Sequence, residues 1–245
     1  REDRGIYGRG IGDKWLVWSE MICSDVPSLT WSWTCNSDIY AYDLQTKEIR
    51  QISRHISDDY PYLDTLPVTN GKWIAWARNP WDDPFDYYVY AHDTQTGTTR
   101  QLSSTRLYDG RAGFYSSIGR HWLSWPDYNT GYPIYSIDVY DLDSNRIKWT
   151  LPFDERTTYL AFPDNSEDKM VYNKYFFYVI NNRKYMRNTN EIHVMDLLTG
   201  QTQIVNDAPT YKSYTKIDRN RVIWSQKTSR LSPAYDLFMA ELPLE

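Results

Sequence analysis

Short segments of alternating aromatic and apolar residues recur five times along the chain. They occupy residues 14–18, 72–76, 121–125, 169–172 and 221–224. Their last aromatic residues are separated by 58, 49, 47 and 52 positions, namely Trp18, Trp76, Trp125, Tyr172 and Trp224. Alternation with a period of two predicts β-strands, and self-similarity near 50 residues is typical of a repeat fold.

Three further strands accompany each aromatic segment, and we call the four strands a, b, c and d in chain order. The aromatic segment is strand b, and strand c follows at residues 38–44, 88–93, 136–142, 191–197 and 236–242. Tight turns lead to strand d at residues 49–52, 99–102, 147–151 and 202–205. A weaker strand a precedes each segment, around residues 6–11, 62–68, 114–118, 158–162 and 214–217.

Small four-stranded antiparallel sheets can bury their faces only against neighbouring sheets, so five such units predict a five-bladed β-propeller. An open stack of the same units is the alternative. The blades fill a single all-β domain, with approximate bounds 1–53, 54–103, 104–153, 154–206 and 207–245. The apolar residue that recurs in strand b is expected to pack between blades, at Leu16, Ile74, Leu123, Met170 and Val222.

The second unit carries the clearest motif. Residues 70–76 read Asn-Gly-Lys-Trp-Ile-Ala-Trp, and residues 88–102 read Tyr-Val-Tyr-Ala-His-Asp-Thr-Gln-Thr-Gly-Thr-Thr-Arg-Gln-Leu. With these motifs the chain resembles the TolB-like β-propeller repeats over all five units. The resemblance implies the fold and leaves the function open, because such propellers include scaffolds, binding modules and non-catalytic domains of peptidases.

The last unit lacks strand d, because only Pro243, Leu244 and Glu245 follow its strand c. An open edge is therefore expected along Leu237, Phe238, Met239 and Ala240. Open edges recruit strands from another copy, from a partner or from a segment outside this sequence, and a proline at Phe238 is expected to block this. The alternative is a short edge that Pro243 protects and that needs no partner.

The b–c connections are long, at residues 19–37, 77–86, 126–133, 173–190 and 225–234. Long loops on a rigid scaffold often carry function, and these predict a ligand-binding or partner-binding face at Trp31, Trp33, Trp81, Asp82, Asp83, Asp86, Tyr128, Tyr132, Tyr175 and Tyr185. Such residues anchor protein interfaces or stack on sugar rings. Alternatively, the rings only pack on one another, or residues 175–180 extend strand b into a hairpin with Arg183 and Lys184 at its tip.

Signatures of catalysis are few. We find no nucleophile elbow, zinc-binding His-Glu-x-x-His motif or phosphate loop, and no catalytic residue is predicted. Carboxylates that recur at the end of strand c are expected to cap the c–d turns: Asp43, Asp93, Asp141, Asp196 and Glu241. Glycoside cleavage uses two carboxylates, and the acidic residues Asp58, Asp59, Asp82, Asp83 and Asp86 are candidates for such a site. The last three also suggest Ca²⁺ weakly, and no other cofactor or metal is expected.

A formal net charge of −5 argues against a nucleic-acid partner, and no apolar run is long enough for a transmembrane segment. Cys23 and Cys35 are the only cysteines, and a disulfide between them is favoured over two free thiols. That disulfide and a first residue other than Met, which suggests a removed secretion signal, predict an extracytoplasmic protein: secreted, periplasmic or at the cell surface.

The preferred hypothesis is a non-enzymatic binding or assembly module. It would contact a protein partner or copies of itself through the b–c loops and the open edge. The alternative is a carbohydrate-binding or carbohydrate-cleaving propeller that uses the loop aromatics and aspartates.

Overall fold

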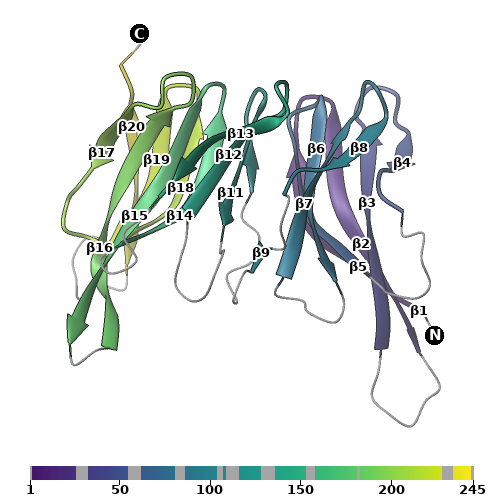
Figure 1. Cartoon of the computed structure of the whole chain (residues 1–245), viewed down its shortest axis with the longest axis horizontal. Coiled ribbons are helices and arrows are strands. Elements are labelled where there is room, and N and C mark those ends of the chain that lie inside the picture. The colour runs from purple at the N-terminus through teal and green to yellow at the C-terminus, as the bar shows by residue number, and fades with distance from the viewer. Residues whose placement is uncertain are drawn as a thin grey trace. The chain divides into compact units, whose positions relative to one another are not determined.

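The computed structural model describes residues 2–25, 33–54, 62–80, 86–103, 107–108, 116–127, 136–152, 158–180, 183–227 and 234–243. These residues form β-strands and turns, and no helix occurs among them (Figure 1). The chain divides into two compact units, Arg1–Phe114 and Tyr115–Glu245, which are described separately.

The first compact unit holds two successive antiparallel groups of strands. The first group is β1 (Glu2–Ile11), β2 (Trp15–Asp25), β3 (Trp33–Asp43) and β4 (Ile49–Gln51). The second is β5 (Tyr62–Thr69), β6 (Trp73–Pro80), β7 (Asp86–Asp93) and β8 (Thr98–Gln101), and the short β9 (Leu107–Tyr108) pairs with β7. One parallel pair, Ser37 opposite Leu63, joins β3 to β5, so these strands count as one nine-stranded sheet.

The second compact unit holds three antiparallel sheets. The first is β10 (Ser117–Ile118), β11 (Trp122–Asp127), β12 (Ser136–Asp141) and β13 (Arg146–Leu151). The next is β14 (Thr158–Ser166), β15 (Lys169–Ile180), β16 (Arg183–Asp196) and β17 (Thr202–Asn206). The last is β18 (Lys212–Asp218), β19 (Arg221–Lys227) and β20 (Tyr235–Glu241). The predicted a-b-c-d order is confirmed. The count of five blades stays a prediction, because the first two groups are joined.

The core lies between consecutive sheets, as the recurrence of strand b predicts. We call the face of a sheet that packs on the following sheet its forward face, and the opposite one its rear face. Three clusters show this packing: Trp15, Val17, Ile39 and Ala41 with Ile74 and Trp76; Trp122, Ile137 and Val139 with Met170 and Tyr172; and Val171, Ile192 and Val194 with Val222 and Trp224. Of the five positions expected between blades, Ile74, Leu123, Met170 and Val222 are fully buried, and Leu16 is half-buried.

Aspartates close the c–d turns, which confirms their predicted structural role. A backbone N–H within each turn donates to the carboxylate at 2.7–3.0 Å: the donor lies two residues after Asp43, Asp93 and Asp141 and three residues after Asp196. Burial alone would raise the pKa of Asp196, but the hydrogen bonds from the Thr199 backbone and hydroxyl outweigh it and hold that pKa below its ordinary value. Glu241, at the corresponding position of β20, instead pairs with Arg221 at 3.3 Å.

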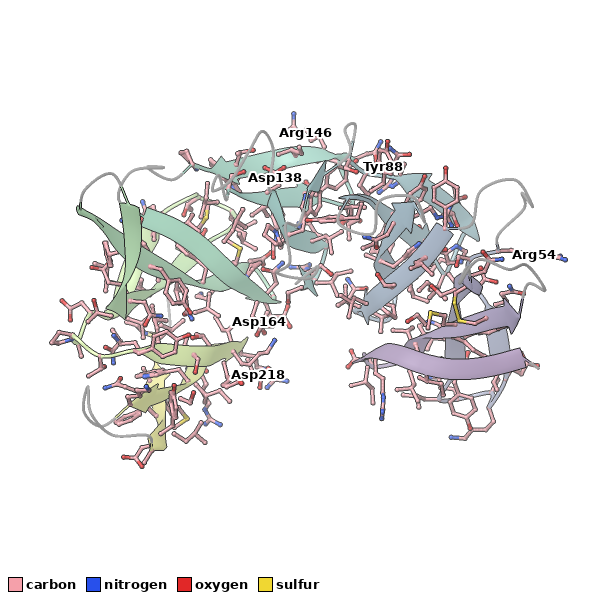
Figure 2. All side chains as sticks on the ribbon, turned by 90° about the horizontal axis from the view of Figure 1, so that it is seen from below. Arg54, Tyr88, Asp138, Arg146, Asp164 and Asp218 are labelled. Carbon is pink, nitrogen blue, oxygen red and sulfur yellow. A yellow bond between two sulfur atoms is a disulfide. The ribbon has the colours of Figure 1, made fainter. Side chains whose placement is uncertain are left out.

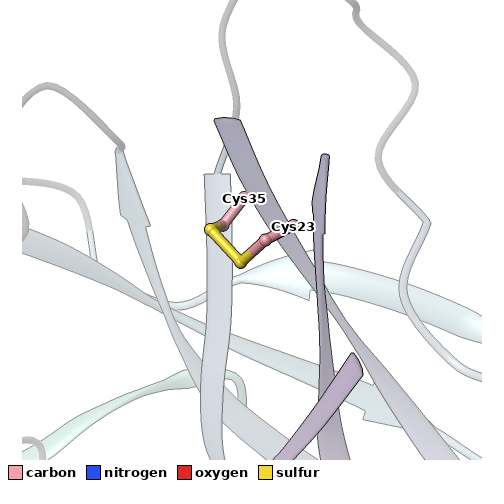
Figure 3. Close-up of a disulfide and its surroundings, with 2 residues drawn as sticks. All are labelled: Cys23 and Cys35. Carbon is pink, nitrogen blue, oxygen red and sulfur yellow. A yellow bond between two sulfur atoms is a disulfide. The ribbon is translucent and has the colours of Figure 1, made fainter. Parts of the chain in front are cut away.

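Two of the connections predicted as long loops are mostly strand. β2 and β3 stay paired as far as Asp25 and Trp33, and β15 and β16 as far as Ile180 and Arg183. The β15–β16 hairpin extends past the other strands of its sheet (Figure 1), whereas in the first group β1 accompanies β2 as far as Ser24. The long-loop prediction is therefore wrong for residues 19–25, 33–37, 173–180 and 183–190, and the alternative of a long fourth-unit hairpin is confirmed. Cys23 and Cys35 face each other across the first hairpin and form the predicted disulfide (Figure 3).

Candidate interaction site

The outer edge of β20 is the site that stands out among the described residues. The last sheet has the order β18-β19-β20, and β20 has only β19 as a hydrogen-bonded neighbour within the described part of the chain. In the four other groups, strand c is covered by β4, β8, β13 or β17. The predicted last unit without its outer strand is confirmed for the described residues.

The pairing of strands b and c shows which residues of the other c strands occupy the same positions as the residues of β20. Phe238 lies opposite Trp224, as Tyr40 lies opposite Trp18. Leu237 is therefore the counterpart of four residues that are 0% exposed: Ile39, Val89, Ile137 and Ile192. Leu237 itself is 76% exposed. Met239 is 59% exposed, whereas its counterparts Ala41, Ala91, Val139 and Val194 are at most 2% exposed.

The rear face of β20 is well anchored. The Phe238 ring stacks on Trp224 with centroids 6.0 Å apart, and Ala240 packs against the cluster that contains Trp224 and Leu242. The backbone N–H of Leu242 also donates to the Asn220 carbonyl at 2.6 Å. β20 is therefore firmly attached through its rear face, and Leu237 and Met239 are exposed on its forward face.

The forward face of the last sheet carries a cluster of exposed apolar side chains: Ile223, Tyr235, Leu237 and Met239. Met239 lies directly opposite Ile223 across the β19–β20 pair. Arg221 and Glu241, both largely exposed, lie at one end of this cluster. The unpaired edge of β20 suits an added strand, whereas the apolar forward face corresponds to the face that packs on the following sheet in the other groups.

Hydrogen bonds elsewhere show which backbone groups point to the open edge. In β3, the N–H of Ile39 donates to Ser53 Oγ at 2.8 Å, and the carbonyl of Ile39 accepts from the N–H of Ile52 at 2.7 Å. By the same register, Leu237 and Met239 direct their backbone groups outward, whereas Phe238 directs its groups toward β19. The expectation that a proline at Phe238 blocks the edge is therefore corrected: it would break the β19–β20 ladder, and Met239 is the position that blocks the edge.

The other predicted site residues fall into three groups. Tyr175 is fully buried, with its ring 6.1 Å from that of Tyr211, so its assignment to an exposed binding face is wrong. The backbone positions of Trp33, Asp86 and Tyr185 lie in β3, β7 and β16. The remaining residues lie outside the described part of the chain and stay predictions: Trp31, Trp81, Asp82, Asp83, Tyr128 and Tyr132. The glycan and calcium hypotheses depend largely on them and stay predictions too.

Lys212 is a buried cation that no sequence pattern indicated. Its side chain is 0% exposed, and its ammonium donates to the carbonyl oxygens of Asn190 at 2.6 Å, Thr210 at 3.2 Å and Ala208. Burial lowers the pKa of Lys212 to about 8, against the raising effect of Asp207 and Glu191. These hydrogen bonds hold the connection between β17 and β18 against β16 at Asn190.

Asp164 on β14 joins the three sheets of the second compact unit. One carboxylate oxygen accepts from Ser117 Oγ at 3.2 Å and from the Lys216 ammonium at 2.8 Å, and the other accepts from the Ile217 N–H at 2.9 Å. Figure 2 labels Asp164 together with Asp218 on the neighbouring β18. Because protein donors occupy both oxygens, Asp164 has a structural role.

Within the described residues, the side chains that could bind a metal ion are not grouped into a site. No three His, Cys, Asp or Glu side chains there are grouped closely enough to hold a metal ion. His92 contacts Thr99 at 2.9 Å, and His193 contacts Glu191 at 2.8 Å while stacking on Tyr172. No helix in this part of the chain is long and apolar enough to cross a membrane.

Comparison with known proteins supports the fold. No protein-family model matches the sequence, and no curated protein sequence matches it. The β-propeller domain of the Trilobed protease from Pyrococcus furiosus is similar, with a TM-score of 0.51 and 11% identity over 97% of this chain and 81% of that chain. A prolyl endopeptidase gives 0.63 and 8% over 97% and 34%, and an oligogalacturonate lyase in complex with manganese gives 0.51 and 14% over 97% and 65%.

These similarities define the class of protein. The chain is a β-propeller, because the sheet order, the packing between sheets and the solved structures agree. Identities of 8–14% show the fold alone. The chain spans about a third of the prolyl endopeptidase. The narrower resemblance to TolB-like repeats stays a prediction from the sequence motifs.

Proposed function

We propose that this β-propeller is a non-enzymatic binding module that accepts an extended polypeptide segment along β20. The observation that carries the proposal is the unpaired edge of β20: among the described residues it pairs only with β19, whereas strand c of each other group also pairs with a strand d. An unpaired edge provides main-chain hydrogen bonds, and the apolar side chains beside it provide area to bury. Addition of a strand would give the last sheet the four strands that the others have.

Two further features support this proposal. The propeller domain of the Trilobed protease is described as having an open velcro topology, which fits a last sheet without an added strand. The disulfide between Cys23 and Cys35 favours an oxidising compartment, so we place the module outside the cytoplasm.

The proposal is tested with a random peptide library displayed on phage and selected against the immobilised protein. Peptides that bind β20 should lose binding to Met239→Pro, because proline removes an outward donor. They should keep binding to the matched control Met239→Thr, which retains the N–H and suits a strand. Circular dichroism must show that both variants are folded. Selected peptides that bind Met239→Pro as well as the native protein, or a failure to select any peptide, would count against the proposal.

A further inference from the structure

The far end of the β15–β16 hairpin is a ribbon of two strands. β14 pairs with β15 as far as Phe176, and β17 pairs with β16 no further than Ile192. Beyond these positions residues 177–180 pair with residues 183–186 and, within the described part of the chain, with no other strand. Figure 1 shows this end projecting past the rest of its sheet. We call residues 176–187 the ribbon.

Two-stranded hairpins are marginally stable in water, so the sequence of the ribbon is informative. The hairpin of the first group has two additional supports: β1 accompanies β2 as far as Ser24, and a disulfide joins Cys23 to Cys35. The chain has no cysteine in the ribbon. The ribbon instead contains five consecutive apolar or aromatic residues in β15, Phe-Phe-Tyr-Val-Ile at positions 176–180.

The register places apolar positions on both faces of the ribbon. Successive residues of a strand belong to opposite faces. One face therefore includes the positions of Phe177 and Val179, and the other includes those of Tyr178 and Ile180. A ribbon with one face in water would alternate apolar and polar residues, which this one does not. Its sequence thus suits surroundings that reach both faces.

The same hairpin is strongly basic in an acidic protein. Residues 173–190 contain four Lys or Arg and no Asp or Glu: Lys174, Arg183, Lys184 and Arg187. The whole chain carries −5 and this segment +4, so the remaining residues carry −9. At the base of the ribbon the Lys174 ammonium lies 5.7 Å over the ring of Phe176. The other three cations belong to β16, about 4.8 Å from the apolar strand β15.

We infer that the ribbon binds the interfacial region of a lipid bilayer that contains anionic phospholipid. A lipid interface can reach both faces of a narrow ribbon, whereas a flat protein surface covers one. Aromatic residues next to Lys and Arg are typical of segments at the membrane–water interface, and anionic headgroups attract the cations. Backbone groups at the outer edges of the ribbon need water, so it lies at headgroup level and does not cross the hydrocarbon core.

The test uses the intact protein and sedimentation with vesicles, either of phosphatidylcholine alone or of equal parts phosphatidylcholine and phosphatidylglycerol. The native protein should bind the anionic vesicles and not the neutral ones, and salt should weaken binding. Adding anionic vesicles should slow hydrogen exchange in residues 176–187 and leave the core strand at residues 72–76 unchanged. Met239→Pro should bind the vesicles like the native protein, because this surface is separate from β20 and independent of the proposed function.

The cations of β16 are tested by the triple variant Arg183→Gln/Lys184→Gln/Arg187→Gln. Each cation near an anionic surface contributes about fivefold, so the affinity for anionic vesicles should fall about a hundredfold. The matched control makes the same change in net charge by replacing three exposed cations outside the ribbon: Arg54→Gln, Arg146→Gln and Arg219→Gln. It should keep most of the affinity.

The apolar positions are tested by Phe177→Thr/Val179→Thr, which suits a strand and should lower the affinity at least about tenfold. Circular dichroism melts must show that every variant keeps the native Tm. The inference is overturned if the native protein does not bind the anionic vesicles, or if the control loses as much affinity as the β16 variant. It is also overturned if poly-glutamate displaces the protein from vesicles and this double variant binds both as well as the native protein, because the partner is then an acidic polypeptide.

Discussion

The Cys23–Cys35 disulfide should contribute measurably to stability. Its half-cystines are buried, directly opposed in β2 and β3, and separated by 12 residues in sequence. Restricting the unfolded chain by a loop of this length is worth about 3 kcal/mol in the chain-entropy treatment. For a domain of this size, 1 kcal/mol corresponds to roughly 2–4 °C in Tm. The double variant Cys23→Ser/Cys35→Ser should therefore melt about 6–12 °C below the native protein.

Circular dichroism melts with and without reductant provide the assay. Dithiothreitol should lower the Tm of the native protein to that of the double variant and leave the variant unchanged. A second variant, Cys23→Ala/Cys35→Ala, controls for the cost of burying two hydroxyl groups. Hydrogen exchange should rise mainly in residues 20–25 and 33–38, because the register from Ser19 opposite Ile39 onward is held by core packing. A Tm change below about 2 °C, or an effect of reductant on the double variant, would refute the entropic reasoning.

Two further substitutions test the buried contacts. Lys212→Met should destabilise the fold by about 2–3 kcal/mol in chemical denaturation near pH 7, because it leaves three carbonyls without their donor. The lowered pKa of Lys212, about 8, means that the folded protein binds fewer protons than the unfolded chain between about pH 8 and 10.5. Native stability should thus rise with pH in that window, and the rise should vanish in the variant, whereas an unchanged slope would contradict the assignment. Gly10→Ala should cost about 2–3 kcal/mol, because its Cβ would lie 2.7 Å from the Pro67 carbonyl oxygen. The control Gly97→Ala meets no atom within 4 Å and should cost about 1 kcal/mol, for its positive φ alone; equal costs would argue against the clash.

The features that depend on local residue chemistry could be predicted from the sequence. Strands b and c were predictable because their inward positions are apolar in every unit and because neighbouring sheets bury them. The role of Asp43 and its counterparts was predictable, since an aspartate at the end of a strand readily accepts the N–H groups of the following turn.

Two kinds of feature could not be predicted from the sequence: contacts with backbone groups far away in the chain, and strands that extend beyond the repeating segments. The partners of Lys212 are backbone carbonyls, which carry no residue-type signal. Residues 19–25 were assigned to a loop because they lie outside the segments that recur in every unit, between strand b and strand c. Tyr175 was assigned to an exposed face because it also follows the recurring segment. In the structure its strand continues beyond the repeat, and the Tyr175 ring lies beside that of Tyr211. Sequence periodicity identifies the strand segments that the repeat buries and misses those that extend past it.

The short length of the open edge explains why recognition should depend on side chains. Within β20, four residues direct backbone groups outward, namely Tyr235, Leu237, Met239 and Glu241, so main-chain hydrogen bonds alone offer limited affinity and almost no selectivity. Charges at Asp236, Arg221 and Glu241 flank the apolar pair, and charged residues on an edge strand discourage pairing with arbitrary strands. Under the proposed function, the same charges that protect the edge from aggregation would restrict which segments pair with β20.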